Sequence, residues 1–142
     1  MLGVGVPFAV SAKNLNPKSN VVLISGDGAF LSGGLSIEAA FQEKKPIVVV
    51  IDNNGGLDCI SQHQERVFES GKHFATDFRD IPFHSIFEGF GGHGELVTKR
   101  EDLGPALKRA LESGKTACVN VKAKGVILSL IHISEPTRLI TI

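Results

Sequence analysis

The sequence carries no excess of charge, no long hydrophobic run and few cysteines. Its 15 basic and 15 acidic residues cancel, which argues against a surface for nucleic acid or an anionic membrane. No apolar run approaches the roughly 20 residues that span a bilayer, and the first residues lack the basic region of a signal peptide. Two cysteines, Cys59 and Cys118, are too few for a disulfide framework, so we expect packing residues in a cytoplasmic protein.

What the sequence does contain is an alternation of apolar runs and helical patterns. Apolar runs predict strands at residues 21–24, 47–51, 95–97 and 116–121. Helical patterns lie at residues 7–14, 35–43, 81–90 and 103–113. The polar segment 53–76 shows no regular pattern and is expected to be a long loop. The alternation indicates an α/β fold of three layers, a mostly parallel sheet with helices on both faces.

Some details of the helices can also be predicted. In the second helical pattern, Leu35, Ala39 and Phe41 are expected to face the sheet. Thr98 and Glu101 have the spacing of a capping box before the last helix. Pro105 predicts either a kink in that helix or a start just before it.

Residues 128–142 do not continue this pattern. The run 128–138 resembles the in-frame translation of a transposase sequencing adapter. We therefore interpret residues 128–142 as a non-native tail and residues 1–127 as the domain. A natural amphipathic tail is the alternative.

Glycine-rich turns follow the first two predicted strands. Asp27 lies in the turn after the first strand, and Asn54 lies in the turn after the second. Parallel strands joined by a crossover helix place their C-terminal ends side by side, so the two side chains are expected to meet at one edge. A carboxylate and an amide there suit a hard divalent cation and the phosphates that it bridges. Taken singly, each residue is equally typical of a capped turn.

The spacing of these residues resembles a known motif. Gly26-Asp27-Gly28, followed after 24 residues by Asn53-Asn54, resembles the thiamine-diphosphate motif of the acetolactate synthase and 2-oxo acid decarboxylase superfamily. The resemblance covers about residues 1–127. It implies the C-terminal, diphosphate-binding domain of such an enzyme, truncated at its N-terminus.

The resemblance also implies roles for individual residues. Mg²⁺ would be bound by the carboxylate of Asp27, the side-chain carbonyl of Asn54 and the backbone carbonyl of Gly56. Thiamine diphosphate would be bound by these three together with Leu2, Gly26, Gly28, Ala29 and Leu57.

Within that set, the glycines and the apolar residues have different tasks. Backbone N–H groups of Gly28 and Ala29 would face the diphosphate, at the start of a helix. Leu2 stands where the family places a bulky apolar residue under the thiazolium ring. Leu57 lies where many relatives have an aromatic residue, so this sequence departs from the family in one wall of the pocket.

The implied reaction cleaves or forms a C–C bond next to a carbonyl, with a 2-oxo acid or acyl donor as substrate, in an acetolactate-synthase-like enzyme. No catalytic residue is expected in this chain, because the activating glutamate belongs to another domain of a partner subunit. A homo-oligomer is therefore expected, and this chain alone is expected to be inactive. The alternatives are a 2-hydroxyacyl-CoA lyase, an oxalyl-CoA or benzoylformate decarboxylase, a non-catalytic cofactor-binding module and a nucleotide-binding regulatory domain.

The histidines show no metal-ligand spacing. His93 is expected to be structural and distant from the Asp27 edge, whereas His63, just past the metal loop, can reach a substrate. His73 and His84 are expected at the surface or at an interface, and Asp52 is expected to be structural.

Overall fold

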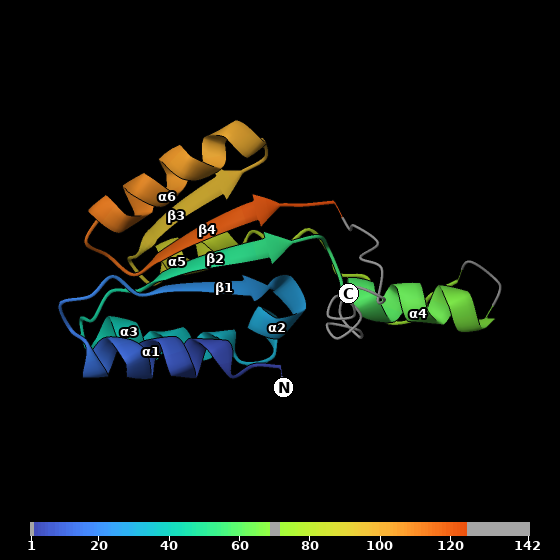
Figure 1. Cartoon of the computed structure of the whole chain (residues 1–142), viewed down its shortest axis with the longest axis horizontal. Coiled ribbons are helices and arrows are strands. Elements are labelled where there is room, and N and C mark those ends of the chain that lie inside the picture. Colours follow the sequence, from blue (N-terminus) through green and yellow to red (C-terminus); the bar gives the residue numbers. More distant parts are fainter. Residues whose placement is uncertain (1, 69–71, 125–142) are drawn as a thin grey trace, which may run out of the picture.

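The computed structural model describes residues 2–68 and 72–124 (Figure 1). The predicted tail at residues 128–142 lies outside the described residues. In chain order the elements are α1 (Gly5–Leu15), β1 (Val22–Gly26), α2 (Asp27–Leu31), the 3₁₀ turn η1 (Gly34–Ile37), α3 (Glu38–Gln42), β2 (Val48–Asn53), α4 (Asp58–Phe68), α5 (Phe83–Gly89), β3 (His93–Val97), the 3₁₀ turn η2 (Arg100–Asp102), α6 (Leu103–Glu112) and β4 (Ala117–Lys122).

The strands form one parallel sheet in the order β1-β2-β4-β3. Val22 lies opposite Val48, and Ile51 lies opposite Asn120. All four strands run in the same direction, so their C-terminal ends lie along a single edge (Figure 1). The predicted strands and the predicted α/β class are confirmed.

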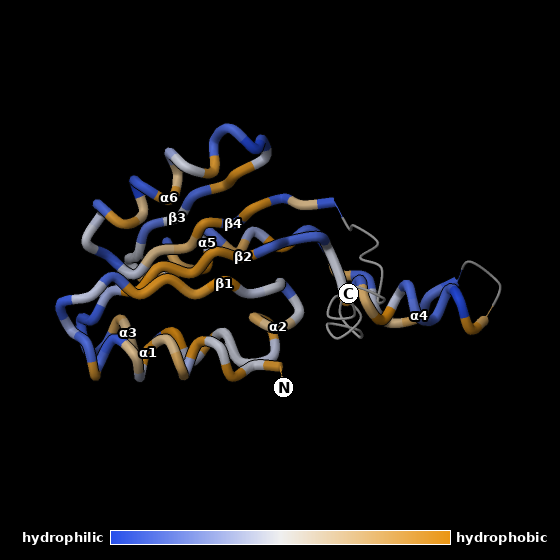
Figure 2. Tube along the Cα trace, in the orientation of Figure 1, coloured by the Kyte–Doolittle hydropathy of each residue, from blue (hydrophilic) through white to orange (hydrophobic). Residues whose placement is uncertain are grey.

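Helices cover both faces of the sheet. On one face α1, α3 and α5 enclose a core that includes Val49, Ile51 and Cys118. Phe30 and Phe83 meet edge-on in this core, with ring centroids 5.6 Å apart. On the other face α6 packs against β3 and β4 through a core of small and branched residues. β1, β2 and β4 are mostly hydrophobic and the outer side of α6 is mostly hydrophilic (Figure 2). The three predicted layers are confirmed.

One face of β1 is not covered, although helices were predicted on both faces of the sheet. Val22 is 41% exposed and Ile24 is 76% exposed. The reason is the position of α6, which packs on β3 and β4 at the far side of the sheet. Whether a strand is covered depends on where a helix distant in the sequence packs. The position of that helix cannot be predicted from the apolar run of the strand itself.

The segment around Leu35 also differs from the prediction. Leu35 is 73% exposed, while Ile37 and Ala40 are buried; Ala39 and Phe41 pack against the core as expected. The segment begins as a 3₁₀ turn, in which residues three apart share a face. Gly34 and Ile37 therefore point inward, and Leu35 points to solvent.

The predicted loop over residues 53–76 contains an eleven-residue helix, α4, which the sequence pattern missed. It lies beyond the C-terminal edge of the sheet (Figure 1), and only Ser61 in it is buried. Most residues of α4 are polar, and its apolar residues Ile60, Val67 and Phe68 are exposed, so the segment does not show the core-facing pattern that predicts a helix. Its polar composition is visible in Figure 2.

The start of α6 was predicted only in part. No side-chain cap hydrogen bond forms there, because the 3₁₀ turn η2 precedes the helix, so the capping box of Thr98 and Glu101 is wrong. Pro105 lies in the first helical turn, which agrees with a start just before it. No helix within the two described ranges has both the length and the apolar character to cross a membrane.

Candidate functional site

The Asp27 carboxylate joins the turn after β1 to the turn after β2. Asp27 is 3% exposed. Its Oδ1 accepts a hydrogen bond from the Gly28 N–H at 2.6 Å, and its Oδ2 accepts from the N–H groups of Gly55 at 2.9 Å and Gly56 at 3.1 Å. Three N–H dipoles aimed at one carboxylate offset the cost of burying its charge. The two turns therefore form a single unit, as the crossover geometry predicts.

The turn after β2 is braced from its other side by residues 76–78. Gly55 has φ +83°, a left-handed conformation that favours glycine. The Gly55 carbonyl accepts from the Phe78 N–H, and the Leu57 N–H donates to the Thr76 carbonyl, each at 2.8 Å. A Cβ on Gly56 would lie 2.5 Å from the Thr76 oxygen. The turn thus leaves no room for another residue at position 56.

The Asn54 side chain is only weakly engaged within the protein. Its Oδ1 accepts from the Gly56 N–H at 3.3 Å, a long hydrogen bond. Asp27 Oδ1 accepts one hydrogen bond, whereas Oδ2 accepts two. Asn54 Oδ1 and Asp27 Oδ1 therefore each keep more free capacity to bind a cation than Asp27 Oδ2.

All the residues predicted to bind the cofactor line one cavity of about 260 Å³. They are Leu2, Gly26, Asp27, Gly28, Ala29, Asn54, Gly56 and Leu57. The prediction missed the further lining residues Asp52, Asp58, Cys59 and Ile60. The last three belong to the first turn of α4, so recognising that helix would have revealed them; Asp52, at the end of β2, was expected to be structural.

Gly26 and Gly28 line the cavity for different reasons. Gly26 has φ −70° and ψ 156°, and a Cβ there would meet no atom within 4 Å. Neither the backbone nor the protein's own packing requires glycine at position 26, so the open space beside it is available to a bound group. At Gly28, by contrast, a Cβ would lie 2.4 Å from Leu57 Cδ2, so a larger residue there would displace the Leu57 side chain in the cavity wall.

The donor set fits Mg²⁺ held jointly with phosphate. Between the two turns the oxygens are the Asp27 carboxylate, the Asn54 amide carbonyl and backbone carbonyls, the ligands that a hard cation prefers. In the described part of the chain, no group of three or more His, Cys, Asp or Glu residues forms a metal site. A cation at this edge would need oxygens from a ligand and water, as Mg²⁺ sites with phosphate have. Because α2 has only five residues, individual N–H groups matter more here than a helix dipole.

Comparison with known proteins identifies the family of this chain. Residues 1–121 match the family model "Thiamine pyrophosphate enzyme, C-terminal TPP binding domain". The chain belongs to this family. The match confirms the resemblance stated above and thiamine diphosphate as the family's cofactor, which Mg²⁺ accompanies in this family. The match stops at residue 121, so the domain boundary at residue 127 stays a prediction.

Among relatives of this thiamine pyrophosphate enzyme domain is the acetolactate synthase large subunit IlvG of Mycobacterium tuberculosis. It is 36% identical over 121 residues, covering 84% of this chain and 22% of that protein. The 2-hydroxyacyl-CoA lyase of Oryza sativa subsp. japonica is 28% identical over 130 residues, with 84% and 22% covered. The chain thus spans about a fifth of the length of these curated relatives.

A solved structure has the same fold. The Rhodococcus jostii RHA1 thiamine diphosphate-dependent 4-hydroxybenzoylformate decarboxylase matches with a TM-score of 0.78 at 30% sequence identity. The match covers 88% of this chain and 24% of that one. Fold and cofactor family are therefore shown, while the roles of the individual residues of this thiamine pyrophosphate enzyme domain stay predictions.

His93 lies away from the site, as predicted. It begins β3 opposite Ala117, at the edge of the sheet where the strands start. Its Nε2 is 2.8 Å from Glu95 Oε1, and Glu95 also accepts two hydrogen bonds from Arg109, at 2.9 and 2.8 Å. The Arg109 hydrogen bonds, with help from His93 and against some burial, lower the pKa of Glu95 to about 2. This cluster ties α6 to β3.

The other histidines vary in their surroundings. His63 is exposed on α4 and is not among the residues that line the cavity, so its reach to a substrate stays a prediction. His73 and His84, which were expected at the surface or at an interface, are half-buried. His73 lies between Glu65 and Asp77, and His84 contacts Asn120.

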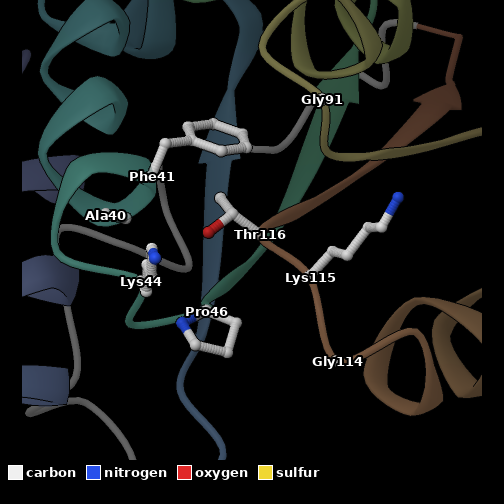
Figure 3. Close-up of a pocket in the computed structure, with 8 residues that line it drawn as sticks. All are labelled: Ala40, Phe41, Lys44, Pro46, Gly91, Gly114, Lys115 and Thr116. Carbon is white, nitrogen blue, oxygen red and sulfur yellow. The ribbon is translucent and has the colours of Figure 1, made fainter.

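A second cavity, of about 160 Å³, lies at the opposite edge of the sheet, where the strands begin (Figure 3). Phe41, Pro46 and Thr116 line it, with Lys44 and Lys115 also at its border. It contains none of the residues predicted to bind the cofactor. The residues predicted to bind the cofactor therefore all line the cavity at the C-terminal edge.

Proposed function

We propose that this chain is the part of a thiamine-diphosphate-dependent synthase or lyase that holds the cofactor's diphosphate through Mg²⁺. The observation that supports this best is the meeting of all the predicted cofactor residues around one cavity, with Asp27 joining its two turns. The match over residues 1–121 supplies the family. The complete enzyme's activity is an extension from relatives of which this chain spans about a fifth.

In this proposal Asp27 Oδ1, Asn54 Oδ1 and the Gly56 carbonyl bind the cation. The N–H groups of Gly28 and Ala29 face the phosphates, and Gly26 leaves space for them. When bound, the cofactor supplies a thiazolium ring that serves as nucleophile and electron sink next to a carbonyl. Leu2 and Leu57 give that end of the cavity an apolar wall, against which the ring would pack.

We further propose an acetolactate-synthase-like reaction on a 2-oxo acid, in a cytoplasmic homo-oligomer. The names of the more similar relatives favour it, including the acetolactate synthase of Bacillus subtilis at 30% identity. A 2-hydroxyacyl-CoA lyase or an aryl-2-oxo acid decarboxylase is the second candidate, supported by the rice relative and the Rhodococcus structure. Leu57 stands in the cavity wall where an aromatic residue was expected. The residue at this position would help to decide which of these substrates the pocket accepts.

Calorimetric titration of the chain with thiamine diphosphate, with and without Mg²⁺, tests the proposal. We expect binding that requires the cation, no competition by ATP, and loss of at least tenfold in affinity for Asp27→Ala. Glu112→Gln is the control, because Glu112 is exposed and, among residues 2–68 and 72–124, pairs only with Lys108, at 3.8 Å. Cation-independent binding, or a preference for ATP, would contradict the proposal.

A further inference from the structure

Three polar side chains form a hydrogen-bonded row beside the proposed metal-binding turn. Asn53 ends β2, directly before Asn54; Asn120 lies in β4 and His84 in α5. Asn53 Nδ2 donates to Asn120 Oδ1 at 3.0 Å, and Asn120 Nδ2 lies 3.3 Å from His84 Nδ1. Asn53 is 4% exposed and Asn120 is completely buried. None of these three residues has a role in the proposed function so far.

The row occupies a position where apolar residues would be expected. Asn120 shares a face of the sheet with Cys118, two positions earlier in β4, which belongs to the core around Ile51. Burying amides there is unfavourable unless they are hydrogen-bonded. A branched apolar residue would suit a central strand better. The amides of Asn53 and Asn120 therefore fix one hydrogen-bonded arrangement of these side chains, in place of the apolar packing that branched residues would give.

The orientation of each side chain follows from its neighbour. Asn53 Nδ2 is also 3.4 Å from the Ile81 carbonyl, which can only accept a hydrogen bond. The NH₂ group of Asn53 therefore faces both partners, and Asn120 must present its oxygen to Asn53. The NH₂ group of Asn120 then faces His84 Nδ1, which accepts the hydrogen bond. His84 thus holds the Asn120 amide in the orientation that Asn53 needs.

The row fixes the end of β2 from two sides. The Asn53 side chain is held by Asn120, and the Asn53 backbone carbonyl accepts from the Ala123 N–H at 3.0 Å. The next residues are Asn54, the proposed metal ligand, and Gly55, whose N–H reaches Asp27. A change in the Asn53 backbone would therefore turn the Asn54 side chain and displace the Gly55 N–H from Asp27.

We propose that Asn120, oriented by His84, is a positioning residue that acts through Asn53 to hold Asn54 and Gly56 in the arrangement that binds the metal. This inference rests on the proposed function. Residues that orient metal ligands typically change metal affinity about 10- to 100-fold when replaced. The same order is expected here for the Mg²⁺-dependent affinity for thiamine diphosphate.

The test compares Asn120→Val, Asn120→Asp and Cys118→Ala with the wild-type chain. Valine suits a strand and keeps the site filled, whereas aspartate retains an oxygen that accepts from Asn53. Hydrogen exchange of the Gly55 and Gly56 amides, measured relative to the amides of β4, reports the turn without any ligand. Titration with thiamine diphosphate and Mg²⁺ reports the site.

For Asn120→Val we expect at least tenfold faster relative exchange at Gly55 and Gly56, and at least tenfold weaker binding. Asn120→Asp should lie closer to wild type in both measurements. Cys118→Ala should lower the melting temperature without changing the relative exchange or the affinity. If Cys118→Ala alters the two amides as much as Asn120→Val, or if Asn120→Val leaves them within twofold of wild type, the inference is overturned.

The two measurements separate this inference from the function on which it rests. If the wild-type chain binds no thiamine diphosphate in the presence of Mg²⁺, the proposed function fails. The exchange rates would still decide the role of Asn120: faster relative exchange in Asn120→Val supports it as the residue that positions the turn, and unchanged exchange overturns that role.

Discussion

Replacing Asp27 by alanine should remove both the link between the two turns and the main charge of the proposed metal site. The variant leaves three N–H groups without their acceptor, those of Gly28, Gly55 and Gly56. The Gly28 backbone is buried, while the two other glycines are half-buried and can recruit water. A buried N–H without a partner costs about 1–3 kcal/mol, so the free energy of unfolding should fall by about 2–4 kcal/mol.

Cofactor binding should widen the difference in stability between the wild-type protein and Asp27→Ala. A ligand at 100 times its dissociation constant stabilises the folded state by about 2.7 kcal/mol. For a domain of this size, 1 kcal/mol corresponds to a melting-temperature shift of about 3–6 °C. Wild-type protein should therefore gain roughly 8–16 °C from saturating thiamine diphosphate and Mg²⁺. Asp27→Ala should gain almost nothing.

Thermal unfolding followed by circular dichroism, with thiamine diphosphate, Mg²⁺, both or neither, measures the two effects together. Glu112→Gln, an exposed charge change far from the turns, should stay within about 0.5 kcal/mol of wild type and keep the full shift. The reasoning would be refuted if Asp27→Ala kept the wild-type stability, or if it retained the shift that requires both ligands.

Further predictions concern a glycine, the two cysteines and one ion pair. Gly26→Ala should leave the free energy of unfolding unchanged or raise it by up to about 1 kcal/mol, because the alanine Cβ would meet no protein atom and φ is −70°. The same variant should weaken cofactor binding in calorimetry. If it lowered stability and affinity alike, the open space assigned beside Gly26 would be contradicted. Iodoacetamide should modify exposed Cys59 but not Cys118, where burial raises the pKa of the thiol to about 12. Thiamine diphosphate with Mg²⁺ should slow the reaction at Cys59, and peptide mass mapping measures both effects. The Glu95–Arg109 pair should contribute stability that is complete above about pH 4.5 and is lost as the pH falls towards the Glu95 pKa of about 2. In urea unfolding, Glu95→Gln should lack this part of the pH dependence of stability. If the variant kept the wild-type pH profile, the ion pair would be excluded as the source of that dependence.

The features that could be predicted from the sequence are those that depend on local pattern and on strand connection. Apolar runs gave the strands, and the crossover rule placed Asp27 and Asn54 at the same edge. Two departures concern burial, and each has its own cause. Ile24 is apolar but exposed because α6 packs over β3 and β4 and leaves one face of β1 uncovered, whereas Leu35 points outward because its segment starts as a 3₁₀ turn.

The hydrogen bonds of the site were beyond the reach of sequence patterns. That the Asp27 carboxylate accepts from Gly55 and Gly56 depends on the path of the turn, which residues 76–78 fix through contacts distant in the chain. The contact between Asn53 and Asn120 joins residues 67 positions apart, through a strand pairing that no local window contains. Long-range pairing of this kind becomes visible only when the sheet order is known.

The uncovered face of β1 has a consequence for the chain in solution. β1 is an edge strand of the described sheet, and Ile24 at its centre is 76% exposed. Exposed apolar edge strands are templates for self-association and aggregation. The isolated chain should therefore sediment with a concentration-dependent mass, and a charged residue in place of Ile24 should keep it monomeric without disturbing the opposite face of the sheet.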